Sequence, residues 1–270
     1  MDKEEDVITD TAATTGRTRK VSRERLARYA LASLAALAIL LGIRGVSPFD
    51  RWSLNSLLLA TALLAVLFLR FEERDYGSRE VAVVGALAAV GAAGRVLFAA
   101  LPGVQPSTFI AFMAGHVFGA ETGFTVGALV ALLSNLFLGQ GPWTPWQMLA
   151  WGAAGASGAL VARMCRGRLR PRVIAATLFS WGFLFGWMMN LWFWLSFVQP
   201  LTLRSYLATC LTSVWFDSFH AAGNLFFAAA LSRPVGGMLA RFRERFTFTH
   251  ESEESGFPAA APARRGIRRR

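Results

Sequence analysis

Long apolar runs recur along this chain, and they constrain its fold more than any other feature. Of its 270 residues, 54% are hydrophobic and only 17% are charged. A helix of about 20 residues spans the hydrocarbon core of a bilayer and satisfies its own backbone hydrogen bonds there. The runs predict an all-α integral membrane protein. They cover residues 27–43, 54–69, 81–101, 108–118, 123–138, 146–164, 173–197 and 206–231.

Positive charge is concentrated between the apolar runs and near the two ends of the chain. The net charge is +11, and the segment 163–172 alone contains Arg163, Arg166, Arg168, Arg170 and Arg172. Because arginine-rich loops prefer the cytoplasmic side, we expect both termini in the cytoplasm and the uncharged segment 139–146 outside. We interpret the arginines as topology signals and contacts to the lipid bilayer, and we expect no nucleic-acid partner.

Several kinds of chemistry lack their sequence signatures. The only lysines, Lys3 and Lys20, precede the first apolar run, so the chain has no P-loop for ATP. Cys165 and Cys210 stand apart, without metal-ligand spacing. We therefore expect no metal site, no intrinsic cofactor and no enzymatic activity. Energy for moving a solute would come from a partner or an ion gradient.

The segment 139–148, which reads GQGPWTPWQM, separates two apolar runs without a single charge. Two prolines restrict its backbone, and Trp143 and Trp146 offer rigid apolar faces with one N–H donor each. Gln140 and Gln147 can both donate and accept hydrogen bonds. We interpret the segment as a stiff outward loop that grips an uncharged or weakly charged solute. The alternative is an aromatic belt at the membrane interface.

Several polar side chains lie inside the apolar runs, where an ionisable group is costly and usually faces a cavity. Asp217, His220 and Asn224 share one helix face by their spacing. The functional interpretation is a polar stripe that lines a binding cavity, and the alternative is interhelical polar contact, such as an Asp217–Arg95 pair. The polar residues concerned are Arg95, Asn135, Asn190, Asp217, His220 and Asn224.

A different class of function is suggested by Ser157 and His220. Ser157 lies in a GASG stretch, and this pairing resembles the dyad of rhomboid intramembrane proteases. However, GASG arises easily in a run of small residues, and the long first loop of that family is missing.

Residues 79–231 resemble the substrate-binding S component of energy-coupling factor (ECF) transporters. The resemblance rests on AAVGAAGRVLFAALPGVQPSTFIAFMAGHVFGAETGF, on GALVALLSNLFLGQGPWTPWQMLAWGAAGASGAL and on DSFHAAGN. Within that family the chain is most similar to the cobalamin or corrinoid branch, which carries an extra helix pair before its core. The resemblance implies a cytoplasmic polar tail at 1–26, extra transmembrane helices within 27–70, a six-helix core at 79–232 and a basic cytoplasmic tail at 233–270.

The family resemblance also implies a function and partners. The chain would be a vitamin-uptake subunit in the bacterial cytoplasmic membrane, with cobalamin or another vitamin as ligand. It would release its ligand inside by toppling on a transmembrane coupling subunit that two cytosolic ATPases drive. The docking face would consist of small residues at helical spacing, although such residues also serve ordinary packing. They are Ala82, Gly85, Ala86, Ala89 and Ala93.

Outward loops and polar helix positions together define the expected ligand site. The loops are 102–107, 139–146 and 199–204. The predicted substrate-binding residues are Asn135, Gln140, Trp143, Trp146, Gln147, Asn190, Asp217 and Asn224.

Overall fold

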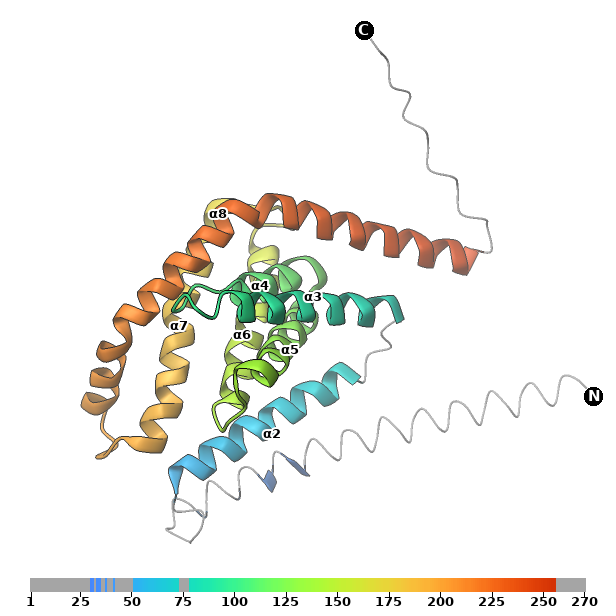
Figure 1. The fold of residues 1–270 in the computed structure, drawn as a ribbon. Helices are drawn as coiled ribbons and strands as arrows, with labels where there is room; N and C mark the ends of the chain where they lie inside the picture. The colour runs from blue at the N-terminus through green and yellow to red at the C-terminus, as the bar shows by residue number, and fades with distance from the viewer. Residues whose placement is uncertain are drawn as a thin grey trace, which may run out of the picture.

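The computed structural model describes residues 51–72 and 78–255, with isolated positions between 30 and 41. Every regular element in these ranges is an α-helix, which confirms the predicted all-α class (Figure 1). The predicted helix 27–43 lies largely outside the described residues, so the extra helix pair stays a prediction. The helices are α2 (Trp52–Glu72), α3 (Ser78–Leu97), α4 (Ser107–Phe118), α5 (Ala120–Leu138), α6 (Thr144–Met164), α7 (Pro171–Phe197) and α8 (Leu203–Ser255).

Three of these helices, α3, α5 and α7, are long and apolar enough to cross a membrane. Many large apolar side chains also remain exposed on the surface. Leu97, Phe137 and Trp215 are 80%, 77% and 75% exposed. Exposed apolar surface on this scale is costly in water and is solvated by lipid. Helix length and surface together indicate a membrane protein.

Glycine and proline set several helix boundaries. Gly119 separates α4 from α5 with φ of +107°, and Gly139 ends α5 with φ of +105°. A residue with a Cβ rarely adopts such angles. Pro145 and Pro171 lie in the first turns of α6 and α7, where a missing backbone N–H breaks no helical hydrogen bond.

The last helix is longer than the sequence predicts. The apolar run predicts an end at residue 231, whereas α8 continues to Ser255. Pro234 lies inside it and removes one helical hydrogen bond. Figure 1 shows α8 bending between its orange and red parts. The predicted boundary between the core and the basic tail, at 232–233, therefore falls within a continuous helix.

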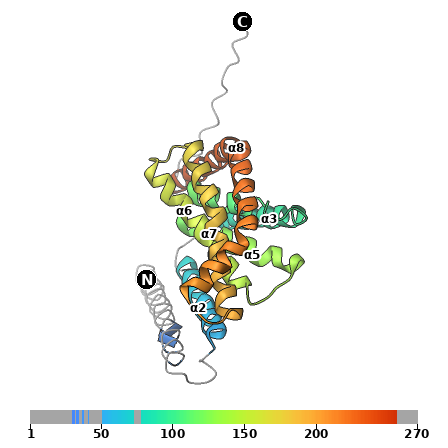
Figure 2. The ribbon, with the colours of Figure 1, turned by 90° about the vertical axis from the view of Figure 1, so that its left-hand side faces the viewer.

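α4, α5 and α6 pack closely at the centre, and α7 and α8 form a neighbouring antiparallel pair (Figures 1 and 2). The main apolar core lies between these two groups. It is built around Phe112, Met113, Ile174 and Leu178, which are all fully buried. α2 lies against α6 and α7, with Leu64 in a second cluster that includes Trp146.

The central packing depends on glycines that let three helix backbones approach one another. A Cβ on Gly155 of α6 would overlap the backbone of Gly123 on α5, and a Cβ on Gly115 of α4 would overlap the backbone of Gly155. Gly158 similarly faces the Phe112 carbonyl of α4. The glycines of the GASG stretch therefore serve helix crossing, as small residues commonly do in membranes.

Candidate functional site

A cavity of about 230 Å³ lies where α6, α7 and α8 meet the end of α3 and the loop after it. The loop between α3 and α4 contributes two residues, and the rest come from the four helices. The lining consists of Arg95, Gly103, Gln105, Gln147, Trp151, Phe185, Gly186, Met189, Asn190, Ser213, Phe216, Asp217 and His220.

Arg95 anchors one wall of the cavity. Its Nη1 donates to Ser134 Oγ at 2.6 Å and to Asn135 Oδ1 at 2.5 Å, and its Nε donates to Gln105 Oε1 at 3.3 Å. The guanidinium also lies over the Trp151 ring, 4.8 Å from its centroid, which is a cation–π distance. The side chain is only 8% exposed. These contacts hold the guanidinium in place and leave Nη2 without a partner among the described residues.

A chain of hydrogen bonds links this wall to the aromatic loop. Asn135 Nδ2 donates to Gln147 Oε1 at 2.8 Å and to Thr144 Oγ1 at 3.0 Å. Thr144 in turn donates to Gln140 Oε1 at 2.9 Å, and Gln140 donates to the Leu132 carbonyl. Side-chain hydrogen bonds therefore attach the loop to the residues around Arg95. The amide N–H groups of Gln147 stay available to donate to a ligand in the cavity.

Asp217, on α8, also lines the cavity. Its Oδ2 accepts a 2.8 Å hydrogen bond from Ser213, whose hydroxyl also accepts one from Asn190 at 2.7 Å. Oδ1 faces Gly186 on α7, and a Cβ at that position would overlap this oxygen. Gly186 thus makes room for the carboxyl group, which is only 1% exposed.

Arg95 and Asp217 line the same cavity without forming an ion pair with each other, and the described part of the chain supplies neither with another oppositely charged partner. The predicted Asp217–Arg95 contact is therefore not made. A buried charge without a charged partner is costly. Because both groups line one cavity, a dipolar or zwitterionic molecule bound there would pair with the guanidinium at one end and with the carboxylate at the other.

His220 closes the inner end of the cavity together with Thr108 and Trp151. Its Nε2 lies 2.9 Å from Thr108 Oγ1, and Trp151 Nε1 donates to the same hydroxyl at 3.1 Å. The rings of Phe185 and His220 meet edge to face at 5.1 Å. Aromatic faces and polar groups therefore alternate around the space, as they do in small-molecule sites.

Of the predicted substrate-binding residues, Gln147, Asn190 and Asp217 line the cavity. Asn135 lies behind the lining and positions Arg95 and Gln147. The other four make structural contacts outside it. They are Gln140 (an exposed loop contact), Trp143 (against Trp192), Trp146 (buried under α2) and Asn224 (bonded to the Leu178 carbonyl).

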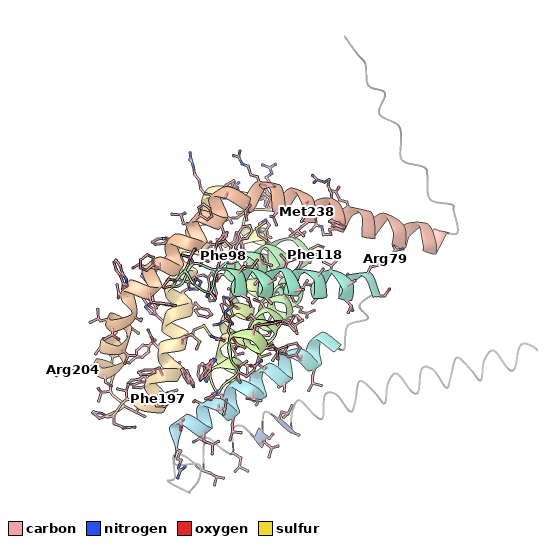
Figure 3. The ribbon with its side chains drawn as sticks, in the orientation of Figure 1. Arg79, Phe98, Phe118, Phe197, Arg204 and Met238 are labelled. Atoms are coloured by element: carbon pink, nitrogen blue, oxygen red, sulfur yellow. The ribbon has the colours of Figure 1, made fainter. Side chains whose placement is uncertain are left out.

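Two of the three predicted loops lie near the cavity. The loop 102–107 supplies Gly103 and Gln105, and the loop 139–146 is tied to the cavity wall by Thr144. The loop 199–204 supplies no lining residue. In Figure 3, Phe197 and Arg204 mark its place at the far end of the α7–α8 pair, away from Phe98.

Several lining residues are absent from the predicted site. Arg95 and His220 carry a sequence signal, since both are ionisable groups inside apolar runs. Trp151, Phe185 and Phe216 carry none, because an aromatic residue in a membrane helix resembles lipid-facing residues until its neighbours are known. Gln105 lies in the predicted loop 102–107, although the sequence does not single it out within that loop.

Ser157 and His220 do not form a catalytic pair in this structure. The Ser157 hydroxyl donates to the Ala154 carbonyl at 2.7 Å and accepts from Trp181 Nε1 at 2.8 Å. The imidazole of His220 pairs with Thr108 instead. A serine nucleophile needs its base within hydrogen-bond reach, and this geometry does not supply one.

The small residues predicted as a docking face lie on one exposed side of α3. Ala82, Gly85, Ala86, Ala89 and Ala93 are all exposed. A Cβ added at Gly85 would meet nothing within 4 Å. The opposite side of α3, with Val84, Ala88 and Arg95, is buried against the bundle. The exposed face is therefore free of cover by any described residue.

Comparisons with family models, with curated proteins and with solved structures gave no match.

Proposed function

We propose that this chain is the substrate-binding subunit of an ECF-type transporter, which captures a small organic nutrient in the cavity between Arg95 and Asp217. The observation that carries the proposal is that a guanidinium and a carboxyl group, both buried and neither with an ion-pair partner among the described residues, line one cavity of a helical membrane protein. Interhelical packing alone does not explain two such groups facing the same space. No comparable observation favours the protease alternative.

The charges and shape of the cavity favour a ligand that is neutral overall but dipolar. A cationic group of the ligand would bind Asp217 Oδ1, and an anionic or carbonyl oxygen would bind Arg95 Nη2. Amide groups of Gln105, Gln147 and Asn190 supply further hydrogen bonds, and Trp151 and Phe185 supply flat apolar contact. A ligand with a large net charge would leave one wall unbalanced and bind weakly.

Cavity volume favours a ligand smaller than a corrinoid. A cavity of about 150 Å³ accommodates benzene, so 230 Å³ corresponds to about ten non-hydrogen atoms at the same density. A corrinoid such as cobalamin is several times larger. It remains the alternative ligand within the same class of function, and binding it would require the α7–α8 pair to move away from α3 and α6.

The resemblance and the charge distribution support a location in the bacterial cytoplasmic membrane, with several spans and both termini in the cytoplasm. The arginine-rich segment 163–172 would lie inside by the positive-inside tendency. The segment 139–146 would then lie outside, so that the cavity receives its ligand from the exterior.

The exposed small face of α3 would dock on the transmembrane coupling subunit, with two cytosolic ATPases supplying energy. Helix backbones approach closely across such faces in membranes. Ala89→Trp should therefore abolish co-purification with a co-expressed coupling subunit and its ATPases, while ligand affinity stays unchanged. Affinity chromatography on a tag of this chain measures the first, and titration calorimetry in mild detergent measures the second.

Ala229→Trp is the matched control for that experiment, because Ala229 is an equally exposed alanine on α8. It should leave the complex intact. If Ala89→Trp retains the complex, the docking face is elsewhere. If the wild-type chain associates with no such module, the ECF assignment fails, whatever the ligand.

A further inference from the structure

A second cavity, of about 440 Å³, lies at the other end of α6. It is separated from the first by the rise of α6 from Trp151 to Arg163, about 18 Å. Figure 3 labels Phe118 and Met238, which mark this part of the molecule. The cavity is lined by His116, Val117, Ala162, Arg163, Gly167, Leu169, Gly236, Ala240 and Arg243.

Both charged residues that line this second cavity are arginines. Arg163 comes from the end of α6 and Arg243 from the second half of α8, and no acidic residue is part of the lining. Arg243 Nη1 donates to the Val117 carbonyl at 3.0 Å, which fixes that side chain at the mouth of the cavity. Two guanidinium groups from elements far apart in the sequence are thus brought to one concave site.

His116 adds a second, independent indication of a ligand. Its side chain is only 6% exposed and lines the cavity, yet neither ring nitrogen has a hydrogen-bond partner. The Gly158 carbonyl lies near the ring but without hydrogen-bond geometry. An unpartnered buried imidazole is costly. A bound group with oxygen atoms would satisfy it.

We propose that this cavity binds a phosphate-bearing group, held by Arg163, Arg243 and His116. Arginine is well suited to phosphate because its planar fork can donate two hydrogen bonds to one group. The group can belong to an acidic phospholipid or to a soluble phosphate. Exposed apolar side chains nearby, Leu160, Met164 and Phe242, favour the lipid source because acyl chains would cover them. The proposal does not depend on the identity of the nutrient in the first cavity.

The test is native mass spectrometry of the full chain released from nanodiscs that contain equal amounts of phosphatidylglycerol and phosphatidylcholine. The wild-type chain should retain phosphatidylglycerol in preference. The double variant Arg163→Gln/Arg243→Gln should retain it about tenfold less. The matched control is Arg168→Gln/Arg170→Gln, which removes the same charge from exposed positions outside the lining and should stay within about twofold of wild type.

Two further measurements complete the test. His116→Phe keeps a ring of similar size and should also reduce retention, which covers the case in which the double arginine variant does not fold.

Inorganic phosphate and glycerol 3-phosphate are added as soluble competitors in detergent. If phosphatidylglycerol is retained through the lining residues, the source is lipid. If phosphatidylglycerol is not retained, but the soluble phosphates bind to the wild-type chain and bind more weakly to the lining variants, the source is a soluble phosphate. Equal losses in the lining and control variants, or no retention of either phosphate compound, would overturn the proposal.

Discussion

Asp217→Asn should weaken binding of the nutrient by about ten- to a hundredfold. The substitution keeps the side-chain shape and the oxygen that accepts from Ser213. It removes the negative charge that faces a cationic group of the ligand, and hydrogen bonds to charged groups are the strong ones. Titration of the purified variant in mild detergent with the compound released from the wild-type chain measures the change.

Asn224→Ala is the control for that result. Asn224 lies on the same face of α8 but donates to the Leu178 carbonyl on α7 and does not line the cavity. Its removal should lower the free energy of unfolding by about 1–3 kcal/mol and leave ligand affinity unchanged. Equal affinity of Asp217→Asn and wild type would contradict the role assigned to the carboxylate.

Gly155→Leu should lower the free energy of unfolding by about 3 kcal/mol or more. The α6 backbone at Gly155 lies so close to Gly115 and Gly123 that even a single added carbon overlaps backbone atoms. Because backbone cannot move aside as a flexible side chain can, α4, α5 and α6 would have to separate. Equilibrium unfolding in mixed micelles, followed by circular dichroism, measures the loss.

Gly85→Leu provides the comparison for this second prediction. Gly85 also lies within a helix, but an added Cβ there meets nothing within 4 Å. The exposed substitution should not lower the free energy of unfolding and should raise it by no more than about 1 kcal/mol, because leucine has a higher helix propensity than glycine. If the two glycine variants unfold with similar free energies, the close crossing of α4, α5 and α6 is not what stabilises the bundle.

The helices could be predicted from the sequence because apolar runs, glycines and prolines act locally. Gly119 and Gly139 end helices through their own backbone angles, and Pro171 begins one. Pro234 is an exception, since the residue before a proline is biased away from the helical conformation and a proline therefore usually indicates a helix end. Here the helix bends and continues, with Leu239 buried beyond the proline.

The site could be predicted only in part, because it depends on contacts between distant segments. Asp217 and Asn190 are detectable as polar residues in apolar runs. Trp143 and Gln140 belong to a distinctive motif, yet the structure uses them to shape and fasten the loop. The pairing of Arg95 with Ser134 and Asn135 spans about 40 residues of sequence, and no local pattern reveals it.

Identification of the small molecule that the chain carries tests the central claim most directly. The full chain is purified in mild detergent, denatured, and the released compounds are identified by mass spectrometry, in parallel with Arg95→Gln/Asp217→Asn. We expect the wild-type chain to release about one equivalent of a small dipolar compound with both a basic and an acidic or carbonyl group, and the double variant to release almost none. Release of the same compound in equal amounts from both proteins would contradict the account, because the two buried charges would then have no part in capturing the nutrient.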